Sequence, residues 1–148
     1  MNQPGMSLIV KNTTRLITGF IAVFGIYIAL TGHISPGGGF AGGVILASAV
    51  VLVVLAFGRD VAARLVTEPQ CHAWDAAGAM GFLAVALLGY LVGGFFWNFL
   101  PTGRLGHLYS GGMIPVANLA ILVKVGAGLA GAFIALALFH RTTQRREI

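Results

Sequence analysis

Lys124 is the side chain in this sequence with the clearest potential for chemistry. It lies in the apolar segment NLAILVKVGAGLAG, about 15 Å along a helix axis from Ile114, where the segment begins. A charge at that depth in a membrane costs roughly 2.5 to 3.5 kcal/mol on insertion scales, and ionisable groups there usually serve ion or proton movement. The alternative is a lysine that faces lipid and extends towards the interface. We favour a paired or functional lysine.

The predicted membrane spans hold no acidic side chain that could balance Lys124. We therefore expect another polypeptide of a complex to supply an acidic group next to it; otherwise the amine is neutral in the membrane. Asn118 could offer an oxygen, but it lies six positions away and on a different helical face. More simply, Asn118 bonds near Pro115, where a backbone donor is missing. All four acids of the chain are predicted to lie outside the spans, on one side of the membrane: Asp60, Glu68, Asp75 and Glu147.

His33, at the predicted outer end of the first span, is a second candidate proton carrier. Imidazole titrates near neutral pH and can relay protons; equally, His33 could be an interfacial side chain bonded to loop carbonyls. His72, His107 and His140 also lie at span ends, too shallow to form the facing pair that ligates haem. Cys71 is the one cysteine, which precludes an internal disulfide, and Cys71 with His72 gives too few ligands for zinc. We expect no catalytic residue, no metal and no cofactor.

A glycine-rich segment, GHISPGGGFAGG, joins the first two predicted spans. It contains a formal G-x-G-x-x-G, but dinucleotide binding requires a preceding strand and a βαβ unit, and membrane helices flank this segment. Proline and adjacent glycines predict a tight helix-to-helix turn. The turn either packs closely against a neighbouring helix or lines a wet cavity. Its predicted residues are Pro36, Gly37, Gly38, Gly39, Phe40, Gly42 and Gly43.

The composition indicates that membrane helices position these residues. Of 148 residues, 57% are hydrophobic and only 9% are charged, and the mean hydropathy is +0.91. These values exclude a disordered chain, a nucleic-acid-binding domain and almost any water-soluble globule. The apolar runs predict an all-α membrane protein, with residues 1–148 forming one domain of four transmembrane helices and short loops. The predicted spans are about 8–31, 40–57, 78–100 and 114–139.

The basic residues predict the orientation, with both termini in the cytoplasm. Arg104 lies alone on the outer side, whereas seven basic residues lie on the other side. Trp74 and Trp97 are predicted to flank the third span as an aromatic belt. A short interfacial helix is predicted over residues 61–66, ending before Pro69. The seven inner basic residues are Lys11, Arg15, Arg59, Arg64, Arg141, Arg145 and Arg146.

Two stretches of the sequence match a known pattern. GHISPGGGFAGGVILA and the later GGMIPVANLAILVKVGAGL resemble the signature stretches of the MnhB/MrpB-type subunits of the Mrp-type multisubunit Na⁺/H⁺ antiporters. The same subunit type occurs in membrane-bound hydrogenases. The resemblance covers essentially the whole chain. By position it implies that the functionally sensitive residues are His33, Pro36, Gly37, Gly38, Gly39, Phe40, Asn118 and Lys124.

The resemblance implies a non-enzymatic accessory subunit of a multisubunit Na⁺/H⁺ antiporter in the cytoplasmic membrane of a prokaryote. Its partners would be other membrane subunits, the transported ions Na⁺ and H⁺, and no nucleic acid. Lys124 would set the local field or relay protons, and the glycine turn would shape an outer opening. The alternatives are the equivalent subunit of a membrane-bound hydrogenase or related respiratory complex, and a purely structural scaffold. A stand-alone exporter is disfavoured because the predicted spans lack a carboxylate.

Overall fold

The described part of the chain folds into four long helices. The computed structural model describes residues 6–58, 67–104 and 106–144. The helices are α1 (Leu8–Leu30), α2 (Gly39–Phe57), α4 (Glu68–Leu88) and α5 (Ile114–Gln144), and two 3₁₀ turns, η1 (Gly89–Leu91) and η2 (Leu108–Gly111), lie between α4 and α5. Each long helix is long and apolar enough to cross a membrane. The described ranges contain no strand. The predicted class, an all-α membrane protein with four transmembrane helices, is confirmed.

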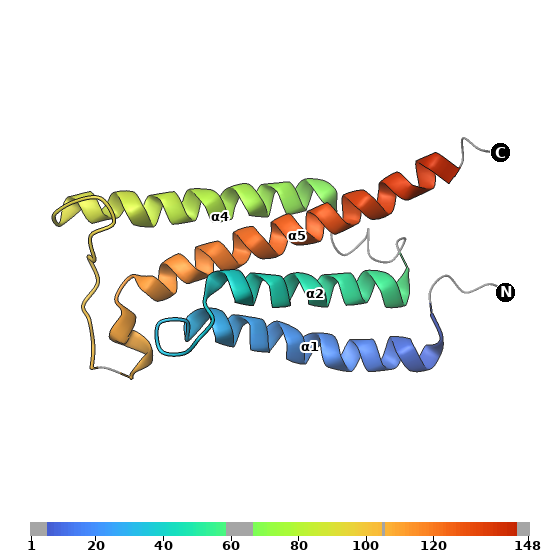
Figure 1. The fold of residues 1–148 in the computed structure, drawn as a ribbon, viewed down its shortest axis with the longest axis horizontal. Helices are drawn as coiled ribbons and strands as arrows, with labels where there is room; N and C mark the ends of the chain where they lie inside the picture. Colours follow the sequence, from blue (N-terminus) through green and yellow to red (C-terminus); the bar gives the residue numbers. More distant parts are fainter. Residues whose placement is uncertain (1–5, 59–66, 105, 145–148) are drawn as a thin grey trace.

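The helices lie side by side in the order α4, α5, α2, α1 (Figure 1). The first residues of α1 and the last residues of α5 lie at the same end of the row. The row is thin: between 17% and 33% of each spanning window is buried within the chain. Most of its surface therefore faces lipid or other proteins.

Small residues bring the helices together. Among the described residues, the buried apolar side chains are mostly alanine, and no large side chain is fully buried. A β-carbon added to Gly42 would lie 2.5 Å from the carbonyl oxygen of Gly25 on α1. One added to Gly43 would lie 2.7 Å from the β-carbon of Val125 on α5. Helix α2 thus packs through its glycines on both neighbours, as small residues do between membrane helices.

The third helix differs from its prediction. It begins at Glu68 rather than at residue 78, and its α-helical part ends at Leu88. Pro69 lies in the first turn, where its missing N–H is harmless. The backbone N–H of Thr67 donates to Oε1 of Gln70 at 3.1 Å and fixes the start of the helix. Pro69 therefore lies in the opening turn of this helix. The interfacial helix predicted over 61–66 lies outside the described residues.

We expect Gly43→Ala to lower the midpoint of thermal unfolding of the detergent-purified protein by several degrees. Its new methyl group meets Val125 and the carbonyl of Leu122, 3.0 Å away, and neither contact can be relieved without moving α2 away from α5. Gly19→Ala is the matched control, because nothing lies within 4 Å of its β-carbon position. Its midpoint should be unchanged or higher, since alanine favours the helix. Equal midpoints for Gly43→Ala and the wild type would contradict the close packing.

Candidate functional site: an ion pair between two membrane helices

Lys124 on α5 forms an ion pair with Asp75 on α4. Its Nζ donates to Oδ1 of Asp75 at 2.9 Å. Lys124 lies in the spanning segment Ile114–Ala137 and Asp75 in the spanning segment Glu68–Leu91. Pairing of this kind lowers the cost of each charge in a membrane. The structure thus brings together a cation and a carboxylate oxygen within the span.

Glycines on both helices make room for this pair. A β-carbon on Gly78 would lie 2.6 Å from the backbone nitrogen of Lys124, so α4 meets α5 almost backbone to backbone. Gly128, one turn after Lys124, leaves space for the carboxylate, because Oδ1 of Asp75 lies 3.3 Å from its β-carbon position. Further along, Gly131 packs on Cys71. The small residues of this seam allow the two charged side chains to meet.

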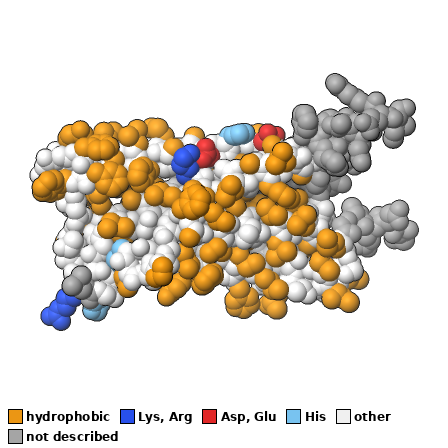
Figure 2. Space-filling view, viewed as in Figure 1, with side chains coloured by type: hydrophobic (Ala, Val, Ile, Leu, Met, Phe, Trp, Pro, Cys, Tyr) orange, Lys and Arg blue, Asp and Glu red, His pale blue; other side chains and the backbone are white. Residues whose placement is uncertain are grey.

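The pair is open to its surroundings on one side. The side chains of Lys124 and Asp75 keep 47% and 38% of their surface exposed. Figure 2 shows one adjacent blue and red pair on the row, among predominantly orange apolar side chains. An exposed ion pair at membrane depth needs water, an ion or a polar group of another protein against it. This geometry makes the open side of the pair the best candidate for an ion-accessible surface.

Asp75 corrects two sequence-based expectations. Another polypeptide was expected to supply the acid next to Lys124, but the acid belongs to this chain. The apolar run predicts a third span that starts at residue 78, which leaves Asp75 outside it, whereas α4 begins at Glu68. Because a spanning helix does hold a carboxylate, its expected absence is no longer a reason against a stand-alone exporter. The pattern that could have revealed Asp75 is its spacing from Gly78 on one face of an apolar helix.

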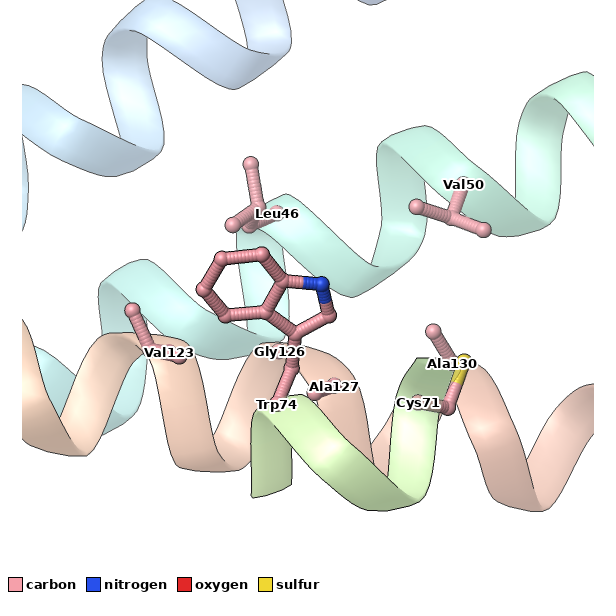
Figure 3. A pocket seen from close by; sticks show the side chains of 8 residues that line it. All are labelled: Leu46, Val50, Cys71, Trp74, Val123, Gly126, Ala127 and Ala130. Carbon is pink, nitrogen blue, oxygen red and sulfur yellow. The ribbon is translucent and has the colours of Figure 1, made fainter. Parts of the chain in front are cut away.

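Trp74 lies beside an apolar groove, and its place in an aromatic belt stays a prediction. With Leu46, Val50 and other apolar side chains of α2, α4 and α5 it lines a cavity of about 240 Å³. Figure 3 shows its indole projecting from α4 towards Leu46 on α2. Consecutive helical residues diverge by about 100°, so Asp75 leaves α4 in a different direction. The groove offers a cation no oxygen ligand, which favours the Asp75 side as the ion-accessible one.

The glycine turn packs on Asn118. Gly39 lies so close to the backbone carbonyl of Asn118 that a β-carbon there would collide with it. The Asn118 side chain lies next to Gly32 and Gly38; its Nδ2 would be 2.9 Å from a β-carbon on Gly32. Gly38 has φ +112°, which favours glycine. Asn118 thus faces the turn and α2, and the expected bond near Pro115 stays a prediction.

The remaining turn residues differ in exposure. Gly42 and Gly43 are buried, whereas Pro36 and Gly37 are exposed. Phe40 is 67% exposed and points away from the other helices of the chain. Close helix packing explains why the buried positions of the turn are glycine. Phe40 presents its apolar ring to the surroundings of the chain.

His33 holds the segment that precedes α5. Its Nε2 lies 3.3 Å from the carbonyl oxygen of His107, and its ring covers Gly111, whose β-carbon would lie 2.7 Å from Cγ. Nδ1 of His33 is buried and has no hydrogen-bond partner among the described residues. The geometry matches an interfacial histidine bonded to a loop carbonyl. His33 contacts residues 107–111, whereas Lys124 contacts Asp75. The two candidate proton carriers therefore lie at separate places in the structure.

A family described as a domain related to the MnhB subunit of Na⁺/H⁺ antiporter matches residues 9–144. The chain belongs to this family. An uncharacterized protein of Methanocaldococcus jannaschii is 33% identical over 133 residues, which are 84% of this chain and 50% of that protein. A Na⁺/H⁺ antiporter subunit of Bacillus subtilis is 46% identical over 50 residues, which are 34% of this chain and 35% of that protein.

A solved structure shares the fold of this chain. A chain in the membrane-bound sulfane sulfur reductase, an archaeal respiratory membrane complex, is 33% identical with a TM-score of 0.71, and the match covers 88% of this chain and 60% of that one. The family member described here therefore spans half the length of the Methanocaldococcus relative, about a third of the Bacillus protein and three-fifths of the reductase chain. Subunits of both antiporters and respiratory complexes are thus similar to it, as its sequence predicted.

We expect His33→Ala to free the segment before α5, because the contact with the His107 carbonyl is lost. Tryptic cleavage after Arg104, an exposed residue of that segment, should become several times faster in the detergent-purified protein. His33→Gln is the matched control, since its amide can still donate to a carbonyl. Its cleavage rate should stay near that of the wild type. Slow cleavage in the alanine variant would show that His33 does not anchor the segment.

Proposed function

We propose that this chain is an accessory membrane subunit of a multisubunit Na⁺/H⁺ antiporter, and that its Lys124–Asp75 pair lines the path of the ions. The observation that carries the proposal is the ion pair itself, 2.9 Å long, between two spanning helices and partly exposed. Its family membership over residues 9–144 supports the antiporter assignment. The thin helix row supports the need for partner subunits, because most of its surface is left uncovered.

The pair has the charge properties that antiport requires. The ammonium of Lys124 and the carboxylate of Asp75 form a neutral pair. The carboxylate oxygen that accepts from Lys124 is also of the kind that can ligate Na⁺. A cation beside Asp75 and the ammonium repel each other, so the two positive charges would compete for one carboxylate. Such competition is a reciprocal coupling.

The orientation and location follow from the same proposal. The excess of basic residues on one side supports an orientation with the start of α1 and the end of α5 on the cytoplasmic side. The turn that carries His33, Pro36 and Phe40 would then lie at the outer face, and the membrane would be the cytoplasmic membrane of a prokaryote. Asn118 and the buried glycines of the turn would hold α2 against α5 and so keep α5 in register with α4.

The test separates ion handling from assembly. Lys124→Met and Asp75→Asn each leave one charge without its partner, so both should reduce the amount of assembled complex. The double variant leaves no charge, and it should assemble at close to the wild-type amount. Its ΔpH-driven Na⁺ exchange in everted vesicles, measured per assembled complex, should be at least about tenfold slower, a loss of roughly 1.4 kcal/mol in barrier lowering. Arg104→Gln, which removes a charge outside the spans, should exchange normally.

Normal exchange by an assembled double variant would show that the pair is a structural contact and the chain a scaffold. If Arg104→Gln is slowed as much as the double variant, the loss is a general response to substitution and is not specific to the pair.

The second candidate function is the equivalent subunit of a respiratory complex, favoured by the similarity to the sulfane sulfur reductase chain. An affinity tag on this chain should copurify the complex from its native membrane. We expect antiporter-like membrane subunits and no subunit that carries a metal cluster. Copurification of stoichiometric iron–sulfur or nickel subunits would favour the respiratory complex instead.

A further inference from the structure

A compact turn closes the end of α4. Residues 89–97, here called the aromatic turn, leave the α-helix after Leu88, pass through η1 and fold back against the helix end. A β-carbon on Gly89 would lie 2.5 Å from the backbone nitrogen of Trp97, which shows how closely the turn folds on itself. The sequence has no Asp, Glu, Lys, Arg or His between Asp75 and Arg104. The aromatic turn therefore carries no charge.

The apolar side chains of the aromatic turn point outwards. Five of them are between 57% and 81% exposed: Tyr90, Leu91, Val92, Phe95 and Trp97. Figure 2 shows hydrophobic side chains gathered at the corresponding end of α4. A water-exposed loop at a helix end normally carries polar residues, and a patch of this kind marks a contact with a membrane or a protein.

The backbone of the aromatic turn is satisfied from within. The carbonyl oxygen of Gly89 accepts hydrogen bonds from the N–H groups of residues 92, 93 and 94 at 3.1 to 3.2 Å. The N–H of Phe96 donates to the Ala86 carbonyl at 3.0 Å, and that of Trp97 to the Gly94 carbonyl at 3.1 Å. Irregular backbone is tolerated away from water only when its polar groups are bonded. The aromatic turn meets this condition for most of its N–H groups.

Ring contacts fix the shape of the aromatic turn. Phe96 packs on Phe82 of α4 with ring centroids 5.4 Å apart, and Phe95 lies 6.0 Å from both Phe96 and Tyr90. Just beyond the turn, Oδ1 of Asn98 accepts hydrogen bonds from the N–H groups of Leu100 and Met113, at 3.3 and 3.1 Å. Asn98 thereby ties the turn to the start of α5. The turn is held at the level where both spanning helices end.

We propose that the aromatic turn is an anchor in the lipid interface, with Tyr90, Leu91 and Trp97 inserted where the headgroups meet the acyl chains. Three observations favour lipid over a protein partner: no charge, internally bonded backbone, and Tyr and Trp at the end of a spanning segment, where their amphipathic rings prefer to lie. The anchor would fix the depth of α4 and with it the depth of Asp75. The inference does not depend on the proposed transport function.

The test uses photo-crosslinking in native membranes that contain the assembled complex. The photoreactive residue p-benzoylphenylalanine is placed at Leu91 or at Trp97, two positions of the anchor, so that one failed variant does not end the test. Thr102, an exposed position in the segment beyond the turn, is the matched control. After irradiation, intact-mass spectrometry of the purified protein measures a phospholipid adduct, and gel mobility measures a link to another polypeptide.

We expect a phospholipid adduct at Leu91 and Trp97 that is several times more abundant than at Thr102. A covalent link to another polypeptide at both positions would overturn the proposal and make the aromatic turn a protein interface. The absence of any adduct at both positions would also overturn it, because the side chains would then lie in water.

Discussion

The ammonium of Lys124 and the carboxylate of Asp75 lie 2.9 Å apart between two helices that are long enough to cross a membrane. Either charge alone would be costly at that depth, so each helix depends on the other. Their contact requires the backbones of α4 and α5 to approach closely, and Gly78 and Gly128 permit this. The ion pair thus explains the small residues where α4 meets α5. It also explains why α4 begins well before the purely apolar segment that follows Asp75.

The ion pair stays exposed because the helices form a row. A compact four-helix bundle would enclose charged side chains in its centre. Here α5 lies between α4 and α2 and has a smaller contact with α1, so much of the row's surface stays open. One side of the α4–α5 seam carries the ion pair, whereas the groove beside Trp74 is apolar. This difference in chemistry suits a chain that is one part of a larger membrane assembly. The names of its family and of the Bacillus relative both refer to an antiporter subunit.

The residues that the family resemblance marks as sensitive act at different places. Gly39 allows α2 to pack on α5, with Asn118 filling the space beside the turn. His33 connects that turn to the segment before α5. Lys124 meets α4. The contacts of Gly39, His33 and Lys124 each involve α5 or the segment just before it, and the ion pair lies near the middle of this helix.

Composition and apolar run length determined the fold class, because a chain with 57% hydrophobic residues and four long apolar runs can bury its backbone only in membrane helices. The glycine turn and Lys124 could also be identified from sequence, since unusual residue types stand out against an apolar background. The pairing of Asp75 with Lys124, the start of α4 and the environments of Asn118 and Trp74 could not. Their roles depend on which face of one helix meets another helix far away in the chain. Such pairing is set by the close packing of small residues, which the sequence pattern of a single helix does not specify.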